Sequence, residues 1–204
     1  MKEGEKMLTN REIREKARES LKDNWGYSIL VALLLNIILS AVGGATFGLG
    51  GLILIGPLTV GTMFFFMNLV RNKETSIEDM FSGFSNFVPN MLIGLLTTIF
   101  VFLWNLLLII PGIIAYYRYG MVYFIANDNP DMDAMQVIQT SKEMMRGYKL
   151  QLFLLELSFI GWALLSLLTF GIGILFLMPY IHASKAAFYE SLKEAKMNNA
   201  EDVF

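Results

Sequence analysis

Long apolar stretches alternate along the chain with short polar segments, and this alternation predicts an all-α protein that crosses a membrane several times. The first two stretches are close to the ~20 apolar residues that a helix needs to cross ~30 Å of hydrocarbon. Four more stretches follow, so the pattern predicts six transmembrane helices within residues 25–190. The expected spans cover residues 25–42, 52–70, 88–110, 113–126, 150–170 and 174–188.

Tight, uncharged turns join these spans in pairs. Pro111-Gly112 interrupts the apolar run LWNLLLIIPGIIAYYRY (103–119) and predicts a turn between the third and fourth spans. Glycine-rich segments at 43–51 and 171–173 predict the other two turns. The second span of each pair also carries a proline. These prolines are Pro57, Pro111 and Pro179. The layout therefore predicts three repeated helical hairpins.

A polar segment with an apolar stripe at helical spacing precedes each hairpin. The stripes are Ile13, Ala17, Leu21 and Trp25; then Ile77, Met80, Phe81 and Phe84; then Ala134, Val137, Ile138, Ser141 and Met145. We expect the second and third segments to form amphipathic helices at the membrane interface. Two interpretations of the first segment, residues 1–24, stay open. It is a solvated charged helix that begins at a Thr9–Glu12 capping box, or a helix lying on the membrane surface beside Trp25.

Basic residues predict the orientation of the spans. Seven Lys or Arg residues precede the first span, and the three turns within the predicted hairpins contain none. Others lie in the remaining polar segments, namely Arg71, Lys73, Lys142, Arg146, Lys149, Lys193 and Lys196, and Lys185 lies near the end of the sixth span. The positive-inside rule then places both termini in the cytoplasm. An even number of spans agrees with this placement. Residues 191–204 are expected to be a polar cytoplasmic tail that frays from Lys193.

Composition supports a membrane location and excludes several kinds of site. The chain is 55% hydrophobic and 17% charged, against about 45–50% and about 25% in soluble domains. The absence of cysteine excludes disulfides, thiolate nucleophiles and cysteine-ligated metals, and one histidine gives no HExxH motif. A net charge of −2 argues against a nucleic-acid partner. There is also no GxSxG, Walker-type loop or GxGxxG motif, so we expect no enzyme activity, cofactor or bound metal.

A cluster of acidic residues in one polar loop requires a separate interpretation. The cluster consists of Asp128, Asp131 and Asp133. The spacing and distal glutamate of an EF-hand are missing, so helix capping accounts for these residues better than a cation site.

Four ionisable residues fall within the expected spans, where charge is costly and marks a candidate functional site. They are Arg118, Glu156, His182 and Lys185. Glu156 and Lys185 lie at similar depth on two antiparallel neighbours, so we expect them to pair. The pair either fixes helix packing or joins His182 in a substrate or proton relay. Alternatively, Lys185 reaches the lipid headgroups, which leaves Glu156 to find another partner.

Arg118 is surrounded in the sequence by Tyr116, Tyr117, Tyr119 and Tyr123. It is expected about two turns beneath the outer end of the fourth span. The arginine either extends outward through a belt of tyrosines or meets a lipid phosphate or anionic substrate between helices.

Three segments resemble a bacterial family of integral membrane proteins named domain of unknown function 975. They are LWNLLLIIPGIIAYYRYGMVYFIANDNP (103–130), SKEMMRGYKLQLFLLELSFIGW (141–162) and GIGILFLMPY (171–180). The resemblance covers about residues 15–192 and implies a six-span protein of the bacterial cytoplasmic membrane, without an accepted activity. The family is also similar to the membrane domain of some glycerophosphodiester phosphodiesterases, whose catalytic half is absent from this sequence.

Together these patterns favour a non-enzymatic membrane scaffold, or a module that binds membrane lipid or a protein partner at the cytoplasmic face. The alternative is a small transporter or a lipid or peptide export component, with Arg118, Glu156, His182 and Lys185 along its path.

Overall fold

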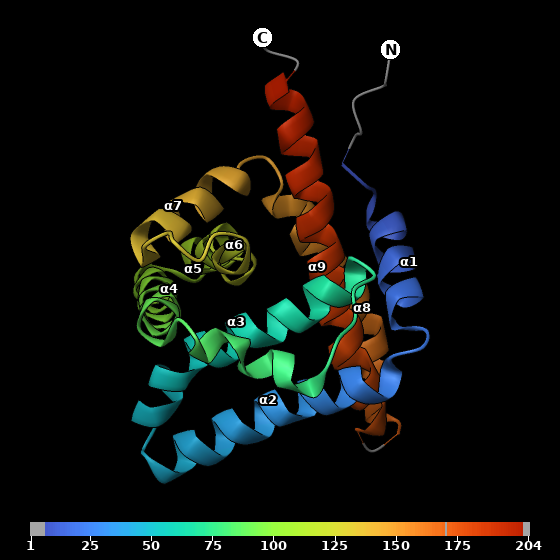
Figure 1. The fold of residues 1–204 in the computed structure, drawn as a ribbon, viewed down its shortest axis with the longest axis horizontal. Coiled ribbons are helices and arrows are strands. Elements are labelled where there is room, and N and C mark those ends of the chain that lie inside the picture. The colour runs from blue at the N-terminus through green and yellow to red at the C-terminus, as the bar shows by residue number, and fades with distance from the viewer. Residues whose placement is uncertain (1–6, 170, 202–204) are drawn as a thin grey trace.

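The computed structural model describes residues 7–169 and 171–201, and every regular element in them is helical. The order is α1 (Asn10–Leu21), α2 (Trp25–Ala45), α3 (Leu49–Val70), η1 (Ile77–Phe84), α4 (Phe87–Leu107), α5 (Ile109–Arg118), α6 (Val122–Asp128), α7 (Ala134–Met144), α8 (Lys149–Leu167) and α9 (Ile172–Glu201). Figure 1 shows these helices along the chain. The prediction of an all-α protein is confirmed. The predicted end of the fifth span at Phe170, and residues 1–6 and 202–204 of the terminal segments, lie outside the described residues.

Five helical segments of the described chain are long and apolar enough to cross a membrane. They are Trp25–Ala45, Leu49–Val70, Phe87–Leu106, Ile109–Asp128 and Lys149–Ser166. The expected sixth span lies in α9, which is not among them. Residues 172–181 of α9 are largely apolar, but His182, Lys185 and Glu190 follow them. The structure therefore supports a membrane protein with several competent helices.

The chain between α4 and α6 differs from the predicted tight turn at Pro111-Gly112. The break lies at Leu108, whose backbone is extended at φ −162° and ψ 148°, and Pro111 falls in the first turn of α5. Proline is favoured there because its missing N–H would have no intrahelical acceptor. A second break at residues 119–121 separates α5 from α6. The predicted fourth span is thus two short helices, and Arg118 is the last residue of the first.

Sequential helices pack in pairs, with one outer and one inner member. α2 packs on α3, α4 on α5, and α8 on α9. Only 22% of the residues in the apolar windows of α2, α4 and α8 are buried, against 50% in α3 and 44% in Ile109–Asp128. Many exposed side chains of the outer helices are large and apolar, as lipid-facing surfaces require.

The helix pairs point in different directions. In Figure 1, α2 and α3 lie across the view, α8 and α9 run up it, and α4 is seen nearly end-on. The connections at the ends of the pairs are apolar and exposed: Phe47 is fully exposed, and Leu108 and Leu168 are 67% and 78% exposed. The connections therefore lie outside the buried core.

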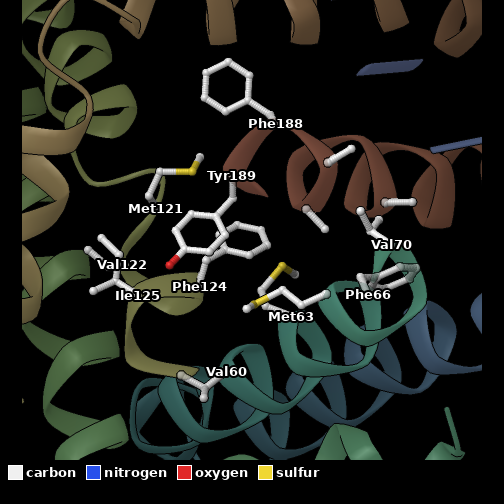
Figure 2. Close-up of a cluster of buried hydrophobic side chains, with 14 of the residues drawn as sticks. Val60, Met63, Phe66, Val70, Met121, Val122, Phe124, Ile125, Phe188 and Tyr189 are labelled. Atoms are coloured by element: carbon white, nitrogen blue, oxygen red, sulfur yellow. The ribbon is translucent and has the colours of Figure 1, made fainter. Parts of the chain in front are cut away.

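The hydrophobic core lies where α3, α6 and α9 meet. Figure 2 shows side chains from all three helices in this core, including Phe66, Phe124 and Phe188. The ring of Phe124 stacks on that of Tyr189 with centroids 5.3 Å apart. This apolar cluster holds the inner helices together.

The three amphipathic segments differ in how far they bury their stripes. Ile13, Ala17 and Leu21 of α1 are fully buried, and α1 packs mainly on α9. The Thr9–Glu12 capping box is present as predicted. Met80 of η1 and Val137 of α7 are also fully buried, but Phe81 and Phe84 of η1 are 45% and 37% exposed. The stripes of α1 and α7 therefore pack against protein, and the stripe of η1 does so only in part.

The polar C-terminal segment continues α9 as a helix. The helix runs without a break to Glu201, and Leu192 and Ala195 within it are buried. The predicted fraying from Lys193 is thus wrong for the described part of the chain, because this segment packs on the core.

Two glycines let η1 approach the backbone of α3. A Cβ added to Gly61 would collide with the carbonyl oxygen of Met80, and one added to Gly83 would collide with that of Pro57. Small residues at helix contacts allow this close approach, which strengthens packing in membranes. The neighbouring atoms are backbone atoms, so they have no side-chain rotation with which to avoid a methyl group.

We predict that Gly61→Ala lowers the melting temperature of the detergent-purified protein and its folded yield. The expected cost is about 1–3 kcal/mol, as for other overpacked sites. Gly44→Ala is the matched control, since a Cβ at this helical position in α2 has open space around it. It should leave the melting temperature unchanged or slightly raised. Equal melting temperatures for Gly61→Ala and the parent protein would contradict the packing argument.

Candidate functional site at a central cavity

A cavity of about 590 Å³ lies between the three helix pairs. Helices α3, α4, α5, α6, α8 and α9 all contribute to its wall. Most of the lining surface is apolar, and Met63, Val101 and Phe124 contribute to it. The lining residues with polar side-chain atoms are Thr59, Thr97, Thr98, Asn105, Tyr116, Tyr119, Tyr123, Glu156, His182 and Lys185. A mainly apolar cavity with a few converging polar groups is typical of a small-molecule site.

The predicted pairing of Glu156 with Lys185 is confirmed. The Nζ of Lys185 lies 2.6 Å from Oε1 of Glu156, and the two side chains are only 23% and 20% exposed. The residues belong to the paired helices α8 and α9, as their antiparallel arrangement predicts. An ion pair this well shielded persists because each charge compensates the other.

Two tyrosines of α5 complete this polar cluster. The Tyr117 hydroxyl donates to Oε2 of Glu156 at 2.7 Å, and the Tyr116 hydroxyl donates to Oε1 at 3.3 Å. Lys185 donates to the Tyr116 hydroxyl at 3.2 Å. The expectation that tyrosines form an outer belt around Arg118 is therefore wrong for Tyr116 and Tyr117. Their hydroxyls bind Glu156, so α5, α8 and α9 are joined at one point.

His182 lies one helical turn from Lys185 and also lines the cavity. Its ring stacks on Phe66 with centroids 5.2 Å apart. The Nδ1 atom is buried and has no hydrogen-bond partner among the described residues. The structure thus brings His182 to the same cavity as Glu156 and Lys185, without a bond between the histidine and either residue in the described chain.

Arg118 is separate from this cluster. It is half-buried at the C-terminus of α5 and is not part of the cavity lining. Its backbone carbonyl accepts a hydrogen bond from Ser141 of α7 at 3.0 Å. In the described part of the chain, its guanidinium makes no ion pair. Three of the four predicted site residues therefore meet, and Arg118 does not join them.

A second charged cluster connects the ends of the inner helices. Arg71, just after α3, lies 2.8 Å from carboxylate oxygens of both Asp128 and Glu190. Lys193 lies 2.6 Å from Asp128, and the Tyr189 hydroxyl donates to the same carboxylate at 3.0 Å. Burial disfavours the charged guanidinium, but hydrogen bonds and attraction to the two carboxylates raise the pKa of Arg71 above its ordinary value.

This cluster corrects part of the interpretation of the acidic loop. Asp133 caps α7, where its carboxylate accepts from the N–H groups of Met135 and Gln136, as predicted. Asp128 instead ends α6 and binds the cations of two other helices. Among the described residues, no three His, Asp or Glu side chains come close enough to hold a metal ion.

Sequence patterns alone identified only part of the cavity wall. Thr97 and Thr98 are single polar residues in a long apolar span, and nothing nearby in the sequence pairs with them. Tyr116 and Tyr117 lie beside Arg118 in the sequence, which suggested Arg118 as their partner instead of Glu156. A helical projection of α5 with α8 as its neighbour is the signal that could have linked them to Glu156.

The polar side chains of this cluster bind one another. Both oxygens of Glu156 already accept hydrogen bonds, and Lys185 is bound to Glu156 and Tyr116. These contacts join Glu156, Lys185 and the two tyrosines into one hydrogen-bonded group. The cavity therefore offers an apolar volume with one fixed polar wall.

The described residues form a helical fold with several membrane-competent helices and a cavity between three helix pairs. The sequence model of the family described as "Protein of unknown function (DUF975)" matches residues 7–115 and 105–196. The chain belongs to this family, as the resemblance of its segments implied. No curated protein and no solved structure matches it.

We predict that Glu156→Gln and Lys185→Met each destabilise the protein by about 3–5 kcal/mol, because each leaves one shielded charge without its partner. The double variant should recover most of the loss, since neither charge then remains. Melting temperatures and folded yields in detergent of the parent, the two single variants and the double variant complete a double-mutant cycle. The exposed pair Arg11–Glu15 on α1 is the control, where Arg11→Gln should cost no more than about 0.5 kcal/mol. Additive losses in the Glu156–Lys185 double variant would show that the two charges are not coupled.

Proposed function

We propose that this protein is a non-enzymatic binding module of the membrane and holds a lipid-like amphiphile in its central cavity. The observation that carries the proposal is the cavity itself: apolar walls from three helix pairs around one compensated polar cluster. An acyl or prenyl chain would fill the apolar volume of the cavity. Its contact with the cavity wall would remove apolar surface of both from water. A hydroxyl or amide of the ligand would bind at Tyr116, Thr97 or Thr98.

Chemistry also favours an uncharged polar group on this ligand. The Glu156–Lys185 pair has no net charge, and each charge is already matched by its partner. A charged headgroup would have to replace one partner of the Glu156–Lys185 ion pair in a low-dielectric site, which is costly. A neutral amphiphile requires no such exchange.

Transport is the second candidate function. Three residues of its proposed path, Glu156, His182 and Lys185, line the same cavity, which supports a polar route between the helix pairs. Arg118 is not among the lining residues. Passage of a charged substrate would require the Glu156–Lys185 contact to open at each cycle, so we prefer binding to transport.

We further propose that six helices cross the bacterial cytoplasmic membrane as three hairpins, with both termini in the cytoplasm. The family implies a bacterial source. The basic residues at one end of the helices and the uncharged, apolar connections at the other support this orientation. A protein partner would then meet the face formed by α1, η1 and α7.

We predict that Thr98→Phe removes one co-purifying amphiphile from the protein. Thr98 lines the cavity and is half-buried, so a phenyl group there fills ligand space. Native mass spectrometry of protein released from mild detergent should show one bound species at several-fold lower occupancy. Leu157→Phe on the exposed face of α8 is the control and should keep full occupancy. Equal occupancy in both variants, with Thr98→Phe correctly folded, would refute ligand binding in the cavity.

The orientation predicts a labelling pattern for single cysteines introduced into this cysteine-free chain. Phe47→Cys lies at the fully exposed connection between α2 and α3, and a membrane-impermeant maleimide should label it in intact cells. Glu78 on η1 is also exposed, and the proposed orientation places it on the cytoplasmic side, so Glu78→Cys should label only after the cells are opened. Labelling of Glu78→Cys alone in intact cells would reverse the proposed orientation.

A further inference from the structure

A second, smaller hollow of about 370 Å³ lies on the surface where α1, α2, α8 and α9 meet. Its residues are Arg18, Trp25, Trp162, Leu165, Ser166, Thr169, Gly173, Phe176, Leu177 and Tyr180. None of them lines the central cavity. We call this surface hollow the α1–α9 groove.

The groove is apolar along its length and basic at one end. Trp25 and Phe176 pack with ring centroids 6.0 Å apart, and Trp162 is 61% exposed in its wall. From Gly173 to Tyr180 the groove follows α9 for ~10 Å, at 1.5 Å per residue. This length suits part of an acyl chain.

Arg18 at the end of the groove carries an exposed charge that no carboxylate compensates in the described chain. It makes none of the ion pairs found there, whereas Arg11 of the same helix binds Glu15 at 3.0 Å. Arg14 lies one turn before Arg18, and its carbonyl accepts a 3.5 Å hydrogen bond from the Tyr180 hydroxyl. The backbone of α1 at Arg14 therefore contacts Tyr180, one turn from Arg18.

Other charged groups near this end do not remove its positive character. Glu15 lies close enough to Tyr180 to affect that hydroxyl, as do Arg14 and Arg18. However, Glu15 is already bound to Arg11. The local balance favours an anion at Arg18, and a guanidinium matches the oxygens of a phosphodiester in both charge and geometry.

We propose that the α1–α9 groove binds one anionic phospholipid. Its phosphodiester contacts Arg18, with Arg14 nearby, and one acyl chain lies along Trp25, Trp162 and Phe176. Trp25 begins α2, where an aromatic side chain is expected at the level of lipid headgroups. This proposal does not depend on the ligand proposed for the central cavity or on the proposed orientation. The positions of the headgroup and the acyl chain follow from the residues of the groove alone.

Tryptophan fluorescence tests this proposal directly. The chain has three tryptophans, and two of them line the groove. In a Trp104→Phe background, only Trp25 and Trp162 report on acyl chains that carry bromine atoms. Detergent-solubilised protein is titrated with dibrominated phosphatidylglycerol and, separately, with dibrominated phosphatidylcholine. Half-maximal quenching should need at least five-fold less of the anionic lipid.

Variants of α1 then assign the preference to one side chain. Arg18→Gln should reduce the difference between the two lipids to less than two-fold, and Arg18→Lys should retain most of it. Lys73→Gln, at an exposed basic residue that does not line the groove, should keep the full preference. Thr98→Phe should also keep it, which separates this site from the central cavity. Equal quenching by both lipids in the Trp104→Phe protein, or an unchanged preference in Arg18→Gln, would overturn the proposal.

Discussion

The three inner helices depend on one network of charges centred on Asp128. Arg71 comes from the end of α3, Asp128 from the end of α6, and Glu190 and Lys193 from α9. These charges are partly withdrawn from water, so each needs its partners to offset the loss of solvation. Since every inner helix supplies at least one member, a shift of any one helix along its axis would leave another helix's charge uncompensated. The network therefore sets the relative position of all three helix pairs at one end.

From this end towards the connections, the space between the inner helices changes in character. Near the network, Phe66, Phe124 and Phe188 are fully buried (Figure 2). Further along α3 and α9, at Thr59 and His182, the same junction opens into the central cavity. The Glu156–Lys185 pair joins α8 to α9 beside this cavity.

Sequence reasoning was most successful where the relevant contact is local or between neighbours in the chain. Apolar length predicted the membrane-competent helices, and a short connection between two antiparallel helices predicted that Glu156 would meet Lys185. The break at Leu108 was missed because proline was assigned to the turn, although the first turn of a helix also favours it. The Asp128 network could not be predicted, because it joins residues from three helix pairs whose packing no single segment specifies.

The two candidate ligand sites differ in whether their charged side chains are paired, and this difference favours a different kind of ligand at each. In the central cavity, Lys185 is matched by Glu156 and both are bound by tyrosine hydroxyls. A charge brought there would find no unmatched opposite charge, so shape and neutral hydrogen bonds would decide affinity. In the α1–α9 groove, Arg18 is exposed and uncompensated among the described residues. An anion there gains attraction without breaking an existing pair, and the surrounding water lowers the cost of bringing it. One chain can therefore hold a neutral amphiphile between its helices and an anionic lipid at its surface.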